Sequence, residues 1–230
     1  MRLTQGRKQD ATVYDSDPVD VARRFEGAGA RMIHVVDLDG AFADGRSPNR
    51  ALAREIFSSV KVPIQFGGGM RSIADVKHMI DGGATRVVVG TLAIESHETL
   101  VTLVKLFGAS VCVSIDARED EVMVRGWERG ARISTIDLAR QIARAGIERI
   151  VYTDVARDGM LSGPNIETSC EIARTSGLRV TASGGVSTLE DIRRLRDCGE
   201  PLVDSVIVGK ALYEGRISLQ EALEVGSGHK

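Results

Sequence analysis

The residues of this sequence best placed to do chemistry stand at the ends of apolar runs. Asp116 ends the run SVCVSID, Thr153 ends RIVYT, and Asp158 follows in the turn ARDG. A carboxyl partly removed from water at such a strand end can keep a proton near neutral pH and act as a general acid. A loop-capping Asp is the competing interpretation for Asp116, and a plain Asp-Gly turn is favoured for Asp158 alone. Asp116 is therefore the first catalytic candidate, with Thr153 placed to position a hydroxylated substrate.

Glycines follow four other apolar runs and indicate phosphate binding. A Gly after a strand lets backbone N–H groups approach an anion, and the next helix directs its positive end toward it. Any tight turn can use one glycine pair, but two pairs at matching places favour binding. Each half of the chain thus offers one candidate phosphate site, and we expect a ligand with two phosphates. The candidates are Gly68, Gly69, Gly90 and Thr91 in the first half, and Gly184, Gly185, Gly209 and Lys210 in the second.

Two loop residues are candidate substrate contacts. Arg71 directly follows the first glycine cluster, where a guanidinium can hold a phosphate or a carboxylate; an exposed Arg at a helix start is the alternative. Trp127, the only Trp, lies in the polar loop GWERG. A lone Trp usually packs in a core, but on a loop at the active end its ring can stack on a planar substrate, and we favour that interpretation.

The elements that must position these residues alternate between strands and helices. Short apolar runs rich in Val and Ile alternate with amphipathic stretches, which predicts βα units around a buried parallel sheet. The helices are expected to begin at Asp17, Asn49, Ser72, Ser96, Ser134 and Thr188. The predicted strands are RMIHVVD, VPIQF, RVVVG, SVCVSID, RIVYT, LRVTAS and DSVIVG.

An internal repeat organises these units into two similar halves. Gly68 and Gly69 align with Gly184 and Gly185 at an offset of 116, and the same offset places Asp37 on Thr153. Four βα units in each half make a (β/α)8 barrel, so we expect a single TIM-barrel domain over residues 1–230. Seven strands are found, and the position matching Asp116 in the first half falls just before the first residue.

Composition and charge exclude several functional classes. The net charge of −2 argues against a general nucleic-acid binder. Cys112, Cys170 and Cys198 are odd in number, far apart and not in CxxC spacing, which suggests neither a disulfide framework nor a zinc site. No apolar run reaches the roughly 18 residues of a membrane span, and the first ten residues lack a signal-peptide core. We expect a soluble, cytoplasmic protein without nucleic-acid or membrane partners.

In their order along the chain, these motifs resemble a known family. The sequence is similar to the phosphoribosylformimino-5-aminoimidazole carboxamide ribotide isomerases of histidine biosynthesis over essentially its whole length. Each motif is modest alone, and the ordered set is specific. The motifs are LTQGRKQDATVY, HVVDLDGAFA, QFGGGMRS, VVVGTLAI, SIDAR, GW, YTDVARDGML, ASGGVS and VIVGKALYEG.

The resemblance implies a (β/α)8 barrel and an Amadori rearrangement of an aminoaldose to an aminoketose on a bisphosphorylated substrate. Asp116 matches the family's general acid, and Thr153 and Asp158 match its supporting polar pair. Arg71 and Trp127 match loop residues that organise the substrate, and Arg2 matches a loop Arg near the first strand. Proton transfer suffices for this chemistry, so the resemblance implies no metal and no organic cofactor. A monomer is expected.

The departure from the family lies at the start of the chain. Family members begin with a strand like PAID whose Asp serves as the base, whereas this chain opens with MRLTQGRKQD. We therefore expect the first strand and the base to be missing, and a natural protein longer by about 15 residues. Losing a general base typically costs about 100- to 10,000-fold in rate, so the activity of this chain by itself is left open.

Four alternatives stay open at this point. The cyclase subunit of imidazole glycerol phosphate synthase shares the repeat and both phosphate loops, but it usually carries a DITAS-like motif where this chain has DLDGAFA. The dual-substrate isomerase, which also acts on phosphoribosylanthranilate, often reads DLDAAFG. A non-catalytic phosphate-binding barrel would bind the ligand without turnover. A truncated barrel completed by another chain is the fourth.

Overall fold

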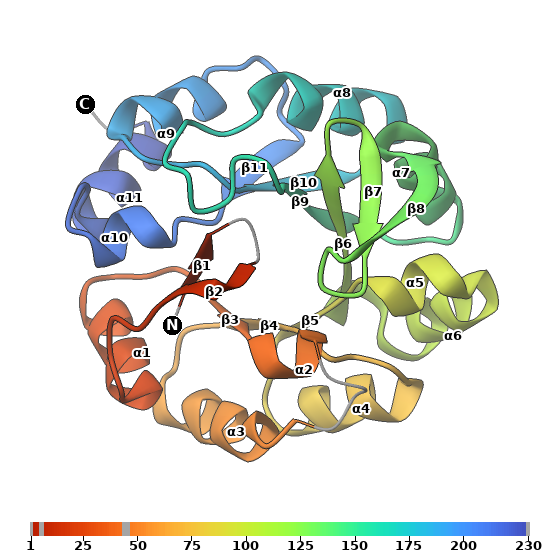
Figure 1. Ribbon diagram of the computed structural model, residues 1–230, viewed down its shortest axis with the longest axis horizontal. Coiled ribbons are helices and arrows are strands. Elements are labelled where there is room, and N and C mark those ends of the chain that lie inside the picture. Colours follow the sequence, from red (N-terminus) through yellow and green to blue (C-terminus); the bar gives the residue numbers. More distant parts are fainter. Residues whose placement is uncertain (1, 5–6, 43–46, 229–230) are drawn as a thin grey trace.

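A computed structural model of the chain describes residues 2–4, 7–42 and 47–228, and for residues 2–4, 7–9 and 11 it describes the backbone only. Figure 1 shows the strands near the centre and the longer helices around them. The alternation of strands and helices predicted from the sequence is confirmed.

Seven parallel strands form one curved sheet, and each matches a strand predicted from the sequence. Their hydrogen-bonded order is β11-β10-β9-β6-β5-β4-β3. Within the described residues, no ladder joins β3 to β11. The α/β class with parallel strands is confirmed, and the sheet is consistent with a (β/α)8 barrel. The strands are β3 (Ile33–Val36), β4 (Ile64–Gly67), β5 (Arg86–Val89), β6 (Val111–Arg118), β9 (Arg149–Asp154), β10 (Arg179–Ser183) and β11 (Val203–Val206).

Two antiparallel ribbons complete the strands. The ribbon of β1 (Arg2–Thr4) and β2 (Arg7–Thr12) forms a separate sheet. The second ribbon, of β7 (Glu121–Val124) and β8 (Arg129–Ser134), grows out of the end of β6, since Asp116 pairs with Met123 and Arg118 with Glu121. The segment predicted to be a polar loop around Trp127 is therefore the turn of a hairpin (Figure 1).

The helices begin mostly at the predicted caps. The side chains of Asp17, Ser72, Ser96, Ser134 and Thr188 all accept backbone N–H groups of the first turn. Asn49 is an exception, because it is the first residue of its helix and its side chain turns to other partners. The longer helices are α1 (Pro18–Gly27), α3 (Asn49–Ser59), α4 (Ile73–Asp81), α6 (His97–Phe107), α7 (Thr135–Arg144), α8 (Ile166–Ser176), α9 (Leu189–Arg196) and α11 (Leu219–Ser227). The short ones are α2 (Leu38–Phe42), α5 (Thr91–Glu95), α10 (Lys210–Tyr213) and the 3-10 turn η1 (Gly108–Ser110).

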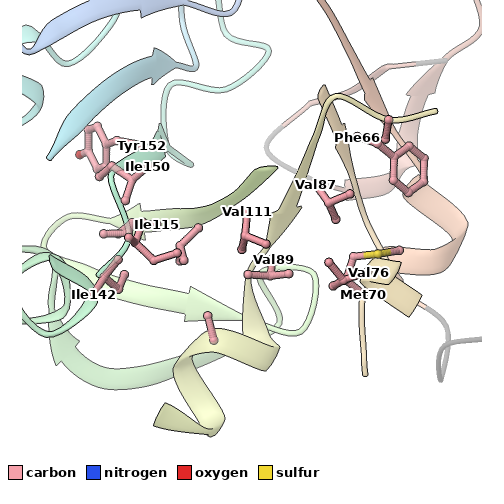
Figure 2. Packing of buried hydrophobic residues seen from close by; sticks show 14 of the residues in the cluster. Phe66, Met70, Val76, Val87, Val89, Val111, Ile115, Ile142, Ile150 and Tyr152 are labelled. Atoms are coloured by element: carbon pink, nitrogen blue, oxygen red, sulfur yellow. The ribbon is translucent and has the colours of Figure 1, made fainter. Parts of the chain in front are cut away.

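The main apolar core lies between the sheet and the helices. Residues of one strand face point outward into the helix layer, because successive side chains of a strand alternate between faces. Removing this apolar surface from water is the main force holding helices on the strands. Figure 2 shows part of this cluster, with Phe66, Met70, Val76, Val87, Val89, Val111, Ile115, Ile142, Ile150 and Tyr152 labelled.

An aromatic contact joins the beginning and the end of the chain. Tyr14 stacks on Tyr213 with ring centroids 5.1 Å apart, and its hydroxyl donates to Glu214 at 3.1 Å. Phe25 of α1 meets the same Tyr213 edge-on at 5.7 Å. These contacts pack α1 against α10, which lie side by side in Figure 1.

The structure corrects the alignment of the two halves by one residue. The ladders pair Val36 with Gly67 in the first half and Thr153 with Ser183 in the second. Gly67 and Ser183 are 116 positions apart, whereas Val36 and Thr153, their partners on the neighbouring strands, are 117 positions apart. Thr153 therefore corresponds to Val36, and the predicted match of Asp37 with Thr153 is wrong. Asp37 corresponds instead to Asp154.

An ion pair at the amino-terminal end of the strands is expected to stabilise the fold in a pH-dependent way. The two terminal guanidinium nitrogens of Arg149 each donate to the Asp204 carboxylate at 2.6 Å, and Arg179 donates a third bond to it at 3.0 Å. Burial alone would raise the pKa of Asp204, but the Arg149 bonds and charge outweigh it and hold the pKa below its usual value. Asp204→Asn should lower the free energy of unfolding by about 1–2 kcal/mol at neutral pH.

The sign of this pH dependence follows from the lowered pKa. The difference between wild type and Asp204→Asn should be complete above the ordinary Asp range and should shrink as pH falls through the folded-state pKa. Denaturant titrations across acidic to neutral pH measure it. Asp197→Asn, which breaks an exposed pair with Arg196, is the control and should change little. A pH-independent difference for Asp204→Asn would contradict the linkage.

Candidate functional site

A cavity of about 420 Å³ opens where the parallel strands end. Its wall includes the residues at or just beyond the carboxyl ends of the strands, such as Gly67, Gly90, Asp116, Thr153 and Ser183. In barrels of this kind the active site lies at this end of the strands. The cavity is therefore the candidate active site.

The cavity brings together all candidate residues from the sequence except one. Arg2 lies in β1, but its side chain is outside what the structure describes. The candidates that line the cavity are Gly68, Gly69, Arg71, Gly90, Thr91, Asp116, Trp127, Thr153, Asp158, Gly184, Gly185, Gly209 and Lys210. Their chemical roles stay predictions, but their juxtaposition is now a feature of the fold.

Asp116 occupies the centre of a hydrogen-bonded group. It lies in β6, directly opposite Thr153 in the parallel register of β6 and β9. Burial raises the pKa of Asp116, and hydrogen bonds from Thr153, Trp127 and Ser114 oppose that rise. A carboxyl in this balance holds its proton to higher pH than an exposed Asp does, while its neighbours still stabilise the anion after the proton leaves. This is the behaviour required of a general acid.

Trp127 reaches Asp116 from the tip of the β7–β8 hairpin. Its backbone adopts φ +70, an uncommon conformation for a bulky residue. The hairpin is fixed to α5, because the Arg125 backbone N–H donates to Thr91 Oγ1 at 3.0 Å and its guanidinium lies 3.2 Å from Glu95. The strain at Trp127 and these anchors set the indole at the cavity wall, where a planar substrate ring can contact it.

The first glycine loop is shaped by contacts that leave no room for side chains. Gly68 has φ +101, and a Cβ there would lie 2.2 Å from the Asp37 carbonyl oxygen. Gly69 has φ +70 and would clash with Gly40. Glycines let a ligand approach the backbone closely, so backbone N–H groups in front of the following helix can contact an anion here. Arg71, whose guanidinium donates to the Ala41 carbonyl at 3.2 Å, places a positive charge beside this loop.

The second glycine loop repeats this construction. Gly184 and Gly185 have φ +89 and +85, and a Cβ on Gly185 would lie 2.2 Å from the Gly163 carbonyl oxygen. Here the cation is Lys210, whose Nζ donates to the Gly159 carbonyl at 3.1 Å. Each glycine loop thus combines a glycine pair with one basic side chain, and we call these two loops the phosphate cradles.

A second pair of glycines is also matched between the halves. Gly90 precedes α5 with φ −111 and ψ −98, and Gly209 precedes α10 with φ −116 and ψ −91. A Cβ on Gly90 would lie 2.9 Å from the Ser114 hydroxyl, so a side chain there would push on the Asp116 group. Each half therefore presents two strand-to-helix turns of matching backbone shape to one cavity.

Sequence reasoning missed two parts of the site. Ser114 lines the cavity and donates to Asp116. The alternation of strand side chains, which puts residues two apart on one face, could have found it.

The other missed part is the support behind the glycine loops. Asn49 donates to Asp37 at 3.0 Å, and Asn165 donates to Asp154 at 2.9 Å, so each half holds its loop with an Asn-to-Asp bond. The one-residue error in the predicted alignment concealed this pairing, because it set Asp37 against Thr153.

Comparison with known proteins decides the family. The family described as histidine biosynthesis protein matches residues 1–218. The chain belongs to this family. Its curated relatives include three enzymes that carry the name 1-(5-phosphoribosyl)-5-((5-phosphoribosylamino)methylideneamino)imidazole-4-carboxamide isomerase.

The relatives of this histidine biosynthesis protein align over almost the whole chain. The isomerase of Desulfitobacterium hafniense strain Y51 is 46% identical over 227 residues, which cover 98% of this chain and 91% of the relative. The isomerase of Desulforudis audaxviator is 47% identical over 223 residues, or 97% of this chain and 85% of the relative. That of Roseiflexus sp. strain RS-1 is 46% identical over 223 residues, with 97% and 92% covered.

The comparisons also bear on one expectation for this family member, and the structure bears on two others. They do not bear out the expectation that the chain lacks a first strand. None of the helices in the described part of the chain combines the length and the apolar character that a membrane span requires. Across the same residues, no group of three or more His, Cys, Asp and Glu side chains is arranged to hold a metal ion.

Proposed function

We propose that the chain is an aldose–ketose isomerase of histidine biosynthesis. It converts the phosphoribosylformimino aminoimidazole carboxamide ribotide from the aminoaldose to the phosphoribulosyl aminoketose form. The observation that carries the proposal is that Asp116 and both glycine loops, each with its basic side chain, line one cavity. The curated isomerase names of the relatives support it. They do not favour the cyclase, dual-substrate or non-catalytic alternatives.

The chemistry assigned to Asp116 is that of a general acid. An Amadori rearrangement begins with opening of the ribose ring, in which the ring oxygen must receive a proton. A protonated Asp116 can donate it, since burial raises the pKa of this carboxyl. The resulting carboxylate is stabilised by Thr153, Trp127 and Ser114, and this group keeps the side chain aimed at the cavity.

The substrate class is supported by the two cradles. One phosphate would sit at Gly68, Gly69 and Arg71, and the other at Gly185 and Lys210. Backbone N–H groups at a helix start and a nearby cation form a favourable environment for a phosphate dianion. Holding both ends of the substrate would fix the reacting carbons beside Asp116, and such orientation is a major source of rate enhancement.

The test of the proposal is an isomerisation assay with the purified protein and the bisphosphorylated aminoaldose. Turnover to the aminoketose, with quenching of Trp127 fluorescence at saturating substrate, is the expected result. Because Trp127 is the only Trp, the fluorescence reports this loop alone. Fluorescence quenching without turnover would favour a binding barrel over an enzyme. Phosphoribosylanthranilate as a second substrate tests for dual specificity.

Replacing Thr153 by Val should shift the pH dependence of the reaction. The Thr153 hydrogen bond lowers the pKa of Asp116, so its loss should raise that pKa further. The alkaline limb of the kcat/KM profile, which reports loss of the acid's proton in the free enzyme, should move to higher pH. One hydrogen bond of about 1 kcal/mol predicts a fall in kcat of about 5-fold.

Thr181→Val is the matched control for this shift. Thr181 is also buried in a strand, but its hydroxyl bonds Ser205 and Arg149, and it does not line the cavity. Its substitution should leave the profile in place. A Thr153→Val enzyme with an unmoved alkaline limb would separate Thr153 from the titration of Asp116.

Several expectations complete the proposal as predictions. The chain would act as one domain over residues 1–230, as a monomer, in the cytoplasm and without a metal or organic cofactor. Sedimentation of the purified protein tests the monomer, and activity after exhaustive chelation tests independence from metal ions.

A further inference from the structure

A second cluster of reactive side chains lies outside the barrel, away from the cavity. Cys170 on α8 and Cys198, two residues beyond the end of α9, line the same surface hollow. This hollow shares no lining residue with the candidate active site. Cys170 is buried and Cys198 is partly exposed.

The surrounding structure holds the two thiols together. Both cysteines pack in one apolar cluster with Ile166, Ala182 and Leu195. An ion pair spans the same gap between the two segments. Arg174, one helical turn after Cys170, lies 3.7 Å from Glu200, which follows Cys198 by two residues.

The two thiols differ in their access to solution. Burial raises the pKa of Cys170 to about 12, with Cys198 and Glu200 adding to the rise and Arg174 opposing it. Cys170 is therefore a neutral thiol at physiological pH and a poor nucleophile toward a dissolved oxidant, so its attack is confined to a sulfur held beside it. Cys198, being partly exposed, is the thiol that a dissolved oxidant meets first. Cys112, the third cysteine, has no exposed surface and lies in a different cluster.

We propose that Cys170 and Cys198 form an oxidisable pair that closes a disulfide between α8 and the segment after α9. With a small disulfide such as oxidised glutathione, Cys198 loses its proton and attacks one sulfur, which releases one glutathione thiol. Cys170 then loses its proton, attacks the Cys198 sulfur and releases the second glutathione. Two protein thiols become one disulfide, and one glutathione disulfide becomes two thiols.

The experiment treats the folded protein with oxidised glutathione and follows free thiols, intact mass and disulfide peptides. We expect two of the three thiols to disappear, the mass to fall by two hydrogen atoms, and a Cys170–Cys198 peptide from a single chain. A reductant should reverse all three changes. The Cys112→Ser variant is the control and should close the same disulfide.

Single variants separate the two steps. Cys170→Ser should stop at one glutathione per chain on Cys198, because nothing resolves the mixed disulfide. Cys198→Ser should take up little glutathione over the same time. The proposal is overturned if wild-type protein keeps glutathione on Cys198, if it forms only disulfides between chains, or if no thiol is lost.

Discussion

Asp116→Asn is expected to abolish most turnover while making the folded protein more stable at neutral pH. The amide keeps the shape of the side chain and can still bond Thr153, Trp127 and Ser114, but it has no proton to give. Loss of a general acid typically costs about 100- to 10,000-fold in rate, and we expect kcat to fall within this range. KM should change much less, since the phosphate cradles are untouched.

The stability gain follows from the direction of the pKa shift. Burial raises the pKa of Asp116, so the folded protein binds this proton more tightly than the unfolded chain does. The contribution of Asp116 to stability is therefore complete below the ordinary Asp range and is lost as pH rises through the raised pKa. The neutral amide escapes that loss. Wild type and variant should be equally stable in acid and diverge toward neutral pH.

Steady-state kinetics measure the loss of turnover, and denaturant titrations in acid and at neutral pH measure the change in stability. Asp81→Asn, which alters an exposed carboxylate paired with Lys77, is the control and should change neither quantity appreciably. A variant of Asp116 that keeps kcat within a few-fold of wild type would remove this residue from the mechanism. A variant that loses activity and stability together would point to a structural role.

Gly185→Ala should weaken substrate binding and stability at once. The residue has φ +85, and its new methyl group would lie 2.2 Å from the Gly163 carbonyl oxygen. The backbone conformation alone costs about 1–2 kcal/mol for a residue with a Cβ, and relief of the clash must move one of the two loops. Because the Gly163 N–H donates to the Gly185 carbonyl at 2.9 Å, both loops would shift. We expect KM to rise by more than about 10-fold through the misplaced phosphate cradle.

Gly177→Ala isolates the clash from the backbone cost. Gly177 ends α8 with φ +73, and among the residues that the structure describes no atom outside its chain neighbours lies within 4 Å of the position a Cβ would take. In thermal unfolding, this variant should lose only the stability that corresponds to the unfavourable backbone conformation, and its KM should stay unchanged. Equal KM values for the two variants would mean that the Gly185 loop does not hold the substrate.

The sequence predicted the strands and the cavity residues well because these depend on local patterns. Runs of Val and Ile mark buried parallel strands, and the glycine pairs mark positions where a side chain does not fit. Asp116 could be found because it ends such a run. The resemblance to the isomerases added Arg2, and its side chain is outside the described structure.

The parts that were not predicted depend on register and on contacts between distant segments. An alignment anchored on Gly68 and Gly184 cannot see that the preceding unit is one residue out of step, and a slip of one residue exchanges the two faces of a strand. The hairpin that carries Trp127 was interpreted as a loop because its residues are polar. Only pairing with the end of β6 makes it a ribbon.

The one-residue difference in register between the two halves makes their contributions to the cavity wall unequal. The two halves present similar glycine loops, so a ligand with a phosphate at each end would find comparable phosphate sites in either of its two orientations. The cavity wall differs between the two halves. Thr153 lies beside Asp116, whereas Val36, the counterpart of Thr153 in the first half, has an apolar side chain. If Asp116 is the proton donor, we expect only one orientation of such a ligand to bring its reacting atoms to Asp116 and Thr153. The residues between the two glycine loops would then select the productive orientation.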